Sequence, residues 1–272
     1  MKWFTELKVD GGPPFWSLGV RHVPEEEWLL TPSDLQVRRD LKQTLWKQQP
    51  NAVYASLIDK SPSSITTLIH SWLQQYDPAR VLSPTFAPEL VWIGQQLAED
   101  LVILERKENG WVVIEGSLCF GFSWSISDKV GLVMDDVHTP VAHYQSEMSA
   151  PVNKLFDRMV SDRIIARRNL GLTDTSELHL SPHRPNNPTP IGDAGSEVFL
   201  RSERQTLRKI GEYILFTIHT DIAPLKETIQ FPELRHSLSK WIESWDAEML
   251  SYKHSAERTR IPTLDWLNRC EQ

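Results

Sequence analysis

The sequence is poor in cysteine and has no long apolar segment. Only 2 of its 272 residues are cysteines, too few for a disulfide scaffold or for a four-thiolate metal or iron–sulfur site. No run approaches the ~20 consecutive apolar residues of a membrane-spanning helix. The first residues, Met1 to Lys8, show neither the apolar stretch nor the small-residue cleavage site of a secretory signal. We therefore expect a cytoplasmic protein that works in a reducing compartment.

Positive charge is also in the minority. The chain has 29 lysines and arginines against 36 acidic residues, a formal net charge of −7. This balance argues against binding nucleic acid or an anionic membrane. The common catalytic signatures are missing as well: there is no phosphate-binding glycine loop, no Gly-x-Ser-x-Gly and no His-Glu-x-x-His. The chain is, by contrast, rich in tryptophan, with 11 residues of this type.

The hydrophobic pattern changes twice along the chain. Apolar residues recur at helical spacing in 31–46, 61–73 and 84–97, and acidic residues favour another helical start at 24–27. Five extended segments follow, at 100–106, 111–116, 117–124, 131–137 and 213–220, the first two joined by an Asn109-Gly110 hairpin turn. Helices are predicted at 152–166, 197–210 and within 232–270. A long polar loop is predicted at 173–195, with three alternatives left open: a lid, a partner contact or a disordered segment.

We predict an α+β fold in one domain spanning 1–272. Residues 1–98 form a helical N-terminal wrap, residues 99–225 a central antiparallel five-stranded sheet, and residues 226–272 the C-terminal helices.

His138 is the first candidate functional residue. It follows the predicted strand 131–137 and precedes Thr139-Pro140. Because Pro140 restricts the backbone, the imidazole would leave the sheet at a defined angle, as a metal or haem ligand must. The alternative is a histidine at a strand end that is hydrogen-bonded to a neighbour.

Three arginines form the second candidate. On the predicted helix 197–210, Arg201, Arg204 and Arg208 fall at i, i+3 and i+7, on one face. Guanidinium groups in a row suit carboxylates, such as haem propionates or acidic partner residues. The alternative is a solvated face in which Glu203 is an internal partner. On the strand 213–220, Thr217 and His219 share one face and could bring polar groups to a pocket.

Several sequence blocks occur in a characteristic order. The most specific is Leu200-Arg201-Ser202-Glu203-Arg204-Gln205-Thr206-Leu207-Arg208, followed by Leu215-Phe216-Thr217-Ile218. The others are Pro14-Phe15, Leu18-Gly19, Glu99-Asp100-Leu101, Gly116-Ser117-Leu118-Cys119-Phe120, Trp124, Lys129, Gly131, His138-Thr139-Pro140-Val141, Arg168-Asn169, Tyr252-Lys253 and Leu267. In these blocks the chain resembles the haem-carrying subunit of the haem-dependent oxidative N-demethylase family, over nearly its whole length.

The resemblance implies a PAS-like sheet that binds haem b and is wrapped by helices. It implies a monooxygenase acting on a small secondary amine such as dimethylamine. Electrons from a nicotinamide cofactor would reach the haem through flavin and iron–sulfur partner subunits, the reductase side of the enzyme. Oxygen insertion into an N-methyl group would release formaldehyde and the shorter amine. The protein would supply the axial ligand and a shaped pocket.

The resemblance also assigns roles to residues. His138 matches the histidine of the His-x-Pro-Val block and becomes the expected axial iron ligand. Arg168, Arg201 and Arg204 become propionate-binding or buried ion-pair residues. Gln205, Thr206 and Thr217 become groups of the catalytic pocket.

The chain departs from the family pattern at four places. Gly121-Phe122 replaces Pro-Ser, Ala142-His143 replaces Pro-Gly, Leu170 replaces a tryptophan, and His219 replaces an arginine. These changes leave three outcomes open: a different substrate, a second iron ligand from His143 or His219, or lost activity. Two alternative functions of the protein also stay open: a haem-binding PAS-like sensor without turnover, and a relative that has lost the cofactor.

Overall fold

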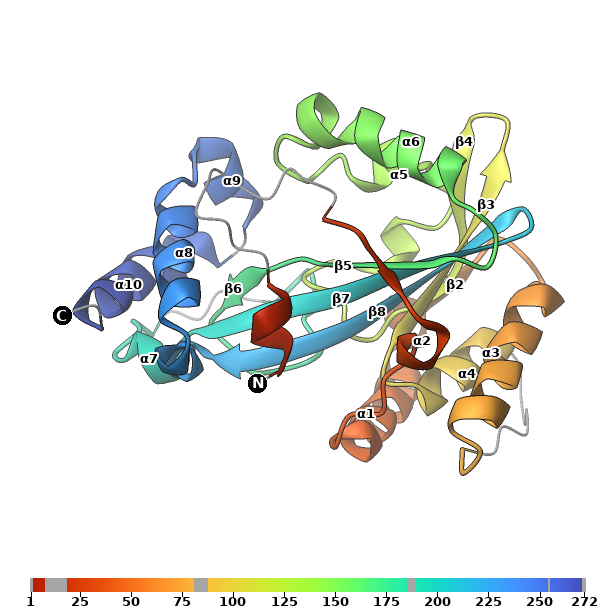
Figure 1. The fold of residues 1–272 in the computed structure, drawn as a ribbon, viewed down its shortest axis with the longest axis horizontal. Helices are drawn as coiled ribbons and strands as arrows, with labels where there is room; N and C mark the ends of the chain where they lie inside the picture. Colours follow the sequence, from red (N-terminus) through yellow and green to blue (C-terminus); the bar gives the residue numbers. More distant parts are fainter. Residues whose placement is uncertain (1, 8–18, 81–87, 185–188, 254, 271–272) are drawn as a thin grey trace.

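An antiparallel sheet forms the centre of the computed structural model, which describes residues 2–7, 19–80, 88–184, 189–253 and 255–270 (Figure 1). Eight strands are present in this part of the chain, and the sheet does not close on itself. Their order is β1 (Arg21–Val23), β5 (Ile164–Arg168), β7 (Phe199–Ile210), β8 (Tyr213–Pro224), β3 (Asp100–Lys107), β4 (Gly110–Ser117) and β2 (Tyr54–Ser56), with β6 (Gly171–Thr173) also paired to β7. The predicted α+β class with an antiparallel sheet is confirmed, whereas the predicted number of five strands is wrong.

Strands β7 and β8 form the longest hairpin and run through the middle of the sheet (Figure 1). Gly211 turns the chain with φ 60°, a conformation that costs glycine little. The predicted helix 197–210 is therefore wrong, and only α7 (Ala194–Glu197) is helical there. β7 pairs with β5 and β8 on its two sides and packs on both faces, so apolar and polar residues do not alternate cleanly along it.

One face of the sheet is covered by helices from the first hundred residues (Figure 1). α3 (Ser63–Tyr76) and α4 (Glu89–Gln96) pack with Trp28 against Leu101 and Ile103. α1 (Leu35–Gln48) lies beside α4, and α2 (Pro50–Val53) follows it. The helices predicted at 31–46, 61–73 and 84–97 are confirmed, except that 84–87 lies outside the described residues.

The opposite face carries α5 (Met134–Val137) and α6 (Ser149–Arg158) (Figure 1). Val102, Leu104 and Leu207 pack there against these helices. The predicted strand 131–137 is wrong: Val133 makes one isolated bridge to Val112, and the chain then enters α5. The predicted helix 152–166 ends at Arg158, and its last residues belong to β5. The segment 117–124 is extended only locally, with one bridge between Phe122 and Leu180.

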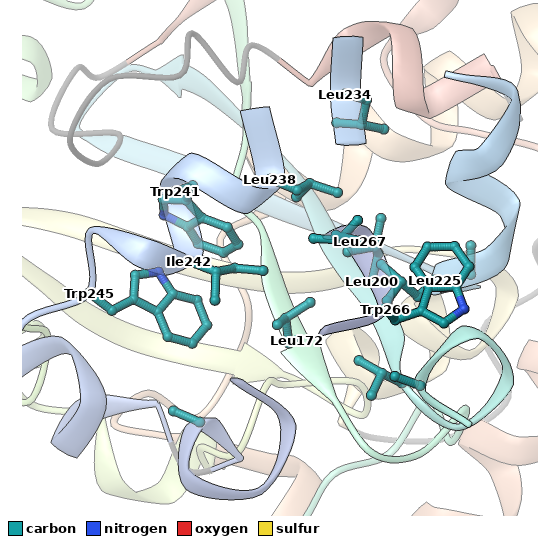
Figure 2. Packing of buried hydrophobic residues seen from close by; sticks show 14 of the residues in the cluster. Leu172, Leu200, Leu225, Leu234, Leu238, Trp241, Ile242, Trp245, Trp266 and Leu267 are labelled. Atoms are coloured by element: carbon teal, nitrogen blue, oxygen red, sulfur yellow. The ribbon is translucent and has the colours of Figure 1, made fainter. Parts of the chain in front are cut away.

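The C-terminal helices gather at one end of the sheet, as predicted for 232–270. They are α8 (Pro232–Glu243), α9 (Ala247–Tyr252) and α10 (Ala256–Arg269). Figure 2 shows their tryptophans and leucines meeting Leu172 and Leu200 of the sheet. Burying each such side chain contributes roughly 1.5–3 kcal/mol, which fixes the position of α9 relative to β7. Short 3-10 segments complete the fold at Lys2–Glu6, Glu25–Glu27, Ile126–Asp128 and Leu225–Gln230, with a π-helical turn at Tyr144–Met148.

The described part of the chain contains no helix with both the length and the apolar character needed to cross a membrane. The polar loop predicted at 173–195 is held to the end of the sheet at Asp174, whose carboxylate lies 2.9 Å from both Arg184 and Arg258.

Candidate functional site

A large cavity lies between the sheet, the segment carrying α5 and α6, and the end of α9. Its volume is about 1320 Å³, above the ~300–1,000 Å³ of most small-molecule sites. Figure 1 shows α5, α6 and α9 on the same side of the sheet. Most of its wall is apolar or aromatic; these lining residues include Val102, Leu104, Phe122, Trp124, Met134, Tyr144, Met148, Phe156, Leu170, Leu207, Phe216 and Trp241. A ligand with a large apolar body fits such a wall.

His138 lines this cavity from the C-terminal end of α5. It ends a short helix, not the strand predicted from the sequence. Its Nδ1 lies 2.9 Å from the carbonyl oxygen of Met134, and its ring stacks on Tyr144 with centroids 4.5 Å apart and planes 8° apart. Because a carbonyl only accepts, Nδ1 carries the hydrogen, which leaves the lone pair on Nε2.

Burial lowers the pKa of His138, and the positive charges of Arg167 and Lys129 lower it further, against the hydrogen bond to Met134. The imidazole is therefore held neutral, in the tautomer that metal-ligating histidines use.

A buried carboxylate faces the same cavity from β7. Glu203 is only 3% exposed and belongs to the cavity wall. Its Oε2 accepts hydrogen bonds from Asn169 Nδ2 at 2.7 Å and Gln205 Nε2 at 3.0 Å, whereas Oε1 has no partner among the described residues. Burial raises the pKa of this carboxyl, while the nearby positive charge of Arg201 lowers it.

Two cationic residues of the cavity wall, Arg167 and Lys253, have perturbed pKa values. Arg167 is half-buried and its Nε has no hydrogen-bond partner in the described structure. Burial lowers its pKa, and the negative charge of Glu203 raises it. Lys253 follows α9, with its Nζ 5.2 Å from the ring centroid of Trp241 and 5.5 Å from that of Trp245. Withdrawal from water among these rings lowers the pKa of Lys253 to about 8.

Four of the residues predicted from the sequence line the cavity: His138, Gln205, Arg168 and Arg204. Both arginines, however, have other partners. Arg168 pairs with Glu6 and Asp221, each at 2.7 Å. Arg204 donates to the main-chain oxygens of Trp28 at 3.0 Å and Glu27 at 2.7 Å.

The other three predicted residues are not among those that line the cavity. Arg201 is completely buried and donates to the carbonyl oxygens of Phe120 at 2.6 Å and Leu178 at 2.9 Å. Burial lowers its pKa to about 10. Thr206 and Thr217 bond to each other, 2.6 Å between hydroxyl oxygens, on the sheet face that packs against α3 and α4.

The predicted grouping of three arginines rested on helical spacing and is wrong. In a strand, alternate residues point to opposite faces, so Arg201 lies on the side of Gln205, and Arg204 and Arg208 lie on the other. Arg208 contacts Glu25 at 2.5 Å and stacks over Trp28.

The two histidines proposed as second iron ligands lie elsewhere. His143 Nε2 is 2.8 Å from Asp246 and its Nδ1 is 3.2 Å from Glu248. His219 is buried between Glu99 and Asp221. Neither histidine belongs to the cavity wall. Three other departing residues do reach it, since Phe122, Ala142 and Leu170 line the cavity.

Sequence reasoning missed Glu203 and Lys253 as site residues and selected Arg168 instead of its neighbour Arg167. Strand alternation separates the two arginines: Arg167 pairs with Gln205 in the sheet and shares its face, and Arg168 pairs with Arg204. Knowing that 164–168 is a strand would have identified Arg167. Nothing local distinguishes Lys253, whose surroundings come from helices α8 and α9.

Comparison with known proteins agrees with the resemblance. Residues 71–260, more than two thirds of the chain, match a family model described as "Haem-dependent oxidative N-demethylase, alpha subunit-like". No curated protein matches the sequence significantly. The matched segment includes all the residues that line the cavity except Glu6, Leu7, Gly19, Val20 and Arg21.

Proposed function

The chain belongs to the haem-dependent oxidative N-demethylase, alpha subunit-like family, and we propose that its cavity holds haem b with His138 as the axial iron ligand. The observation that carries this proposal is a neutral imidazole in the cavity wall whose Nδ1 is bonded to Met134 and whose Nε2 keeps its lone pair. Most metal-ligating histidines are oriented by a hydrogen bond that the other ring nitrogen donates.

The residues present fit a haem better than a bare metal ion. Among the described residues, no group of three or more His, Cys, Asp or Glu side chains could hold a metal. A haem brings four nitrogen ligands of its own and needs only one axial side chain. The volume of the cavity and its apolar and aromatic wall suit the macrocycle.

The propionates need positive partners. We propose Arg167 and Lys253 for this role, because both line the cavity and no ion pair within 4.0 Å involves either side chain among the described residues. Arg168 and Arg204 are further candidates, although their guanidinium groups are bonded elsewhere. Arg201 holds the chain at Phe120 and Leu178, so its contribution to the site is to position that segment.

We propose that the chain is the haem subunit of a monooxygenase that demethylates a small secondary amine. Bound haem would supply oxygen activation for hydroxylating an N-methyl group, which then leaves as formaldehyde. Gln205 and Glu203 present polar groups to the cavity, and Leu207 and Phe216 exclude water beside them. Electrons would come from a nicotinamide cofactor through flavin and iron–sulfur partner subunits, in keeping with the alpha-subunit-like family.

Haem reconstitution tests this proposal. The wild-type protein should take up one haem and give a Soret band that His138→Ala changes or abolishes. His183→Ala is the matched control, because this exposed histidine lies outside the cavity wall. Formaldehyde release from dimethylamine with a reductase then separates an enzyme from a haem sensor. Failure of the wild type to take up haem would contradict the proposal.

A further inference from the structure

We propose that Glu203 is the counter-ion that binds the substrate as a secondary ammonium ion, through its unpartnered Oε1. This inference deepens the proposed function, on which its identification of the ligand as substrate rests. Binding of the cation itself can be measured independently of haem.

The hydrogen bonding of Glu203 defines one free acceptor position. Asn169 and Gln205 occupy Oε2, and Asn169 Oδ1 also accepts from the Glu203 backbone N–H at 2.7 Å. These contacts fix the carboxylate and leave Oε1 buried without a donor. A buried, unpaired carboxylate oxygen costs free energy unless a ligand or proton satisfies it.

The charge around Glu203 is also incompletely compensated. No nitrogen of Lys, Arg or His lies within 4.0 Å of its carboxylate in the described part of the chain. Arg201 acts on it electrostatically, but the guanidinium group of Arg201 donates to main-chain oxygens instead. A small cation at Oε1 would supply the missing contact.

The surroundings indicate what kind of cation fits. The free Oε1 can accept one N–H of a secondary ammonium ion, and its negative charge compensates the charge of that ion. Leu207 lies on the same face of β7 as Glu203, and Phe216 pairs with it from β8; both line the cavity. The methyl groups of such an ion would face the apolar part of the cavity wall while one N–H contacts Oε1.

The experiment is calorimetric titration of the full chain with dimethylammonium chloride at neutral pH. Glu203→Gln keeps the size of the side chain and removes its charge, and we expect a dissociation constant about 10- to 100-fold higher, as for loss of a charged hydrogen bond. Glu115→Gln is the matched control. Glu115 is also a buried carboxylate with one unpartnered oxygen, but it lies outside the cavity.

Three results would overturn the inference: no binding of dimethylammonium to the wild type, equal binding by Glu203→Gln, or an equal loss in Glu115→Gln. A second measurement needs no variant. Dimethyl ether is a neutral isostere of dimethylammonium. If the wild type bound the ether as tightly as the cation, Glu203 would not act as a counter-ion.

Haem titration is run on the same samples. If the wild type binds dimethylammonium through Glu203 but takes up no haem, the proposed function fails and the cation site stands. If haem binds through His138 while Glu203→Gln binds the cation like the wild type, the proposed function stands and the inference about Glu203 fails.

Discussion

The rings of His138 and Tyr144 lie face to face, with centroids 4.5 Å apart and an interplanar angle of 8°. The two residues flank the turn that carries Pro140, and both line the cavity. The stack and the Nδ1 bond to Met134 together fix the imidazole plane. Its orientation is therefore set before any ligand arrives.

Removing the stack should weaken haem binding without unfolding the protein. An aromatic pair contributes about 0.5–1.5 kcal/mol beyond its buried area, so Tyr144→Leu should raise the haem dissociation constant about 2- to 10-fold. Tyr144→Phe keeps the ring and should bind haem like the wild type. Equal haem affinity in the leucine and phenylalanine variants, measured by Soret titration, would show that the stack does not position His138.

Lys253 should oppose folding while it favours haem. Its pKa is about 8 in the folded protein, below the ordinary 10.5. The folded state therefore binds the proton less readily than the unfolded state, and the penalty is complete below pH 8. Lys253→Met should raise the free energy of unfolding at pH 7 by the order of 1–2 kcal/mol, less than a fully buried group would give.

The same variant should bind haem more weakly, because one propionate loses its partner. Haem dimethyl ester carries no propionate charge, so the wild type and Lys253→Met should bind it alike. The stability difference between the two proteins should shrink as the pH rises above about 8 toward 10.5. Urea titrations at pH 7 and pH 10 measure this, and a difference that grows with pH would refute it.

His143 occupies a backbone conformation that suits glycine, with φ 57°. Its side-chain contacts with Asp246 and Glu248 join the segment carrying His138 to α9, and its backbone N–H donates to Glu248 Oε1 at 2.6 Å. His143→Ala loses these side-chain contacts and keeps the backbone strain, whereas His143→Gly loses the same contacts and relieves the strain.

We therefore expect His143→Gly to be more stable than His143→Ala by about 1 kcal/mol. Glu248→Gln should cost about 0.2–1 kcal/mol, since both partners are partly exposed, and high salt should reduce that loss. Chemical denaturation with and without salt measures both effects. An alanine variant as stable as the glycine variant would show that the backbone at this position is not strained.

Arg201 should matter for stability and not for haem affinity. Arg201→Met leaves the carbonyl oxygen of Leu178 without its donor and leaves that of Phe120 with only the Thr220 hydroxyl, 3.3 Å away. Each buried acceptor left unsatisfied costs about 1–3 kcal/mol, so the variant should unfold at clearly lower urea. Its folded fraction should bind haem with wild-type affinity. Weaker haem binding at unchanged stability would instead support the propionate role predicted from the sequence.

The sequence predicted some elements well because their patterns are local. α1 and α3 have helical apolar spacing, and the turn at Asn109-Gly110 determines the β3–β4 hairpin. β7 was mistaken for a helix because both of its faces are packed and its arginines happen to fall at i, i+3 and i+7. Periodicity cannot distinguish such a strand from a helix.

The site was predictable to a similar extent. The His138-Thr139-Pro140-Val141 block located the candidate ligand, although not the helix end that carries it. Glu203 and Lys253 were missed because their significance lies in what surrounds them. The unpartnered oxygen of Glu203 and the aromatic rings around Lys253 come from contacts distant in sequence.

The most direct test of the haem site is replacement and rescue of the His138 imidazole. We expect His138→Gly to fold and to lose the wild-type Soret spectrum on addition of haem, and free imidazole to restore that spectrum by entering the vacated space. A wild-type spectrum in His138→Gly without imidazole would contradict the assignment of His138 as the axial ligand.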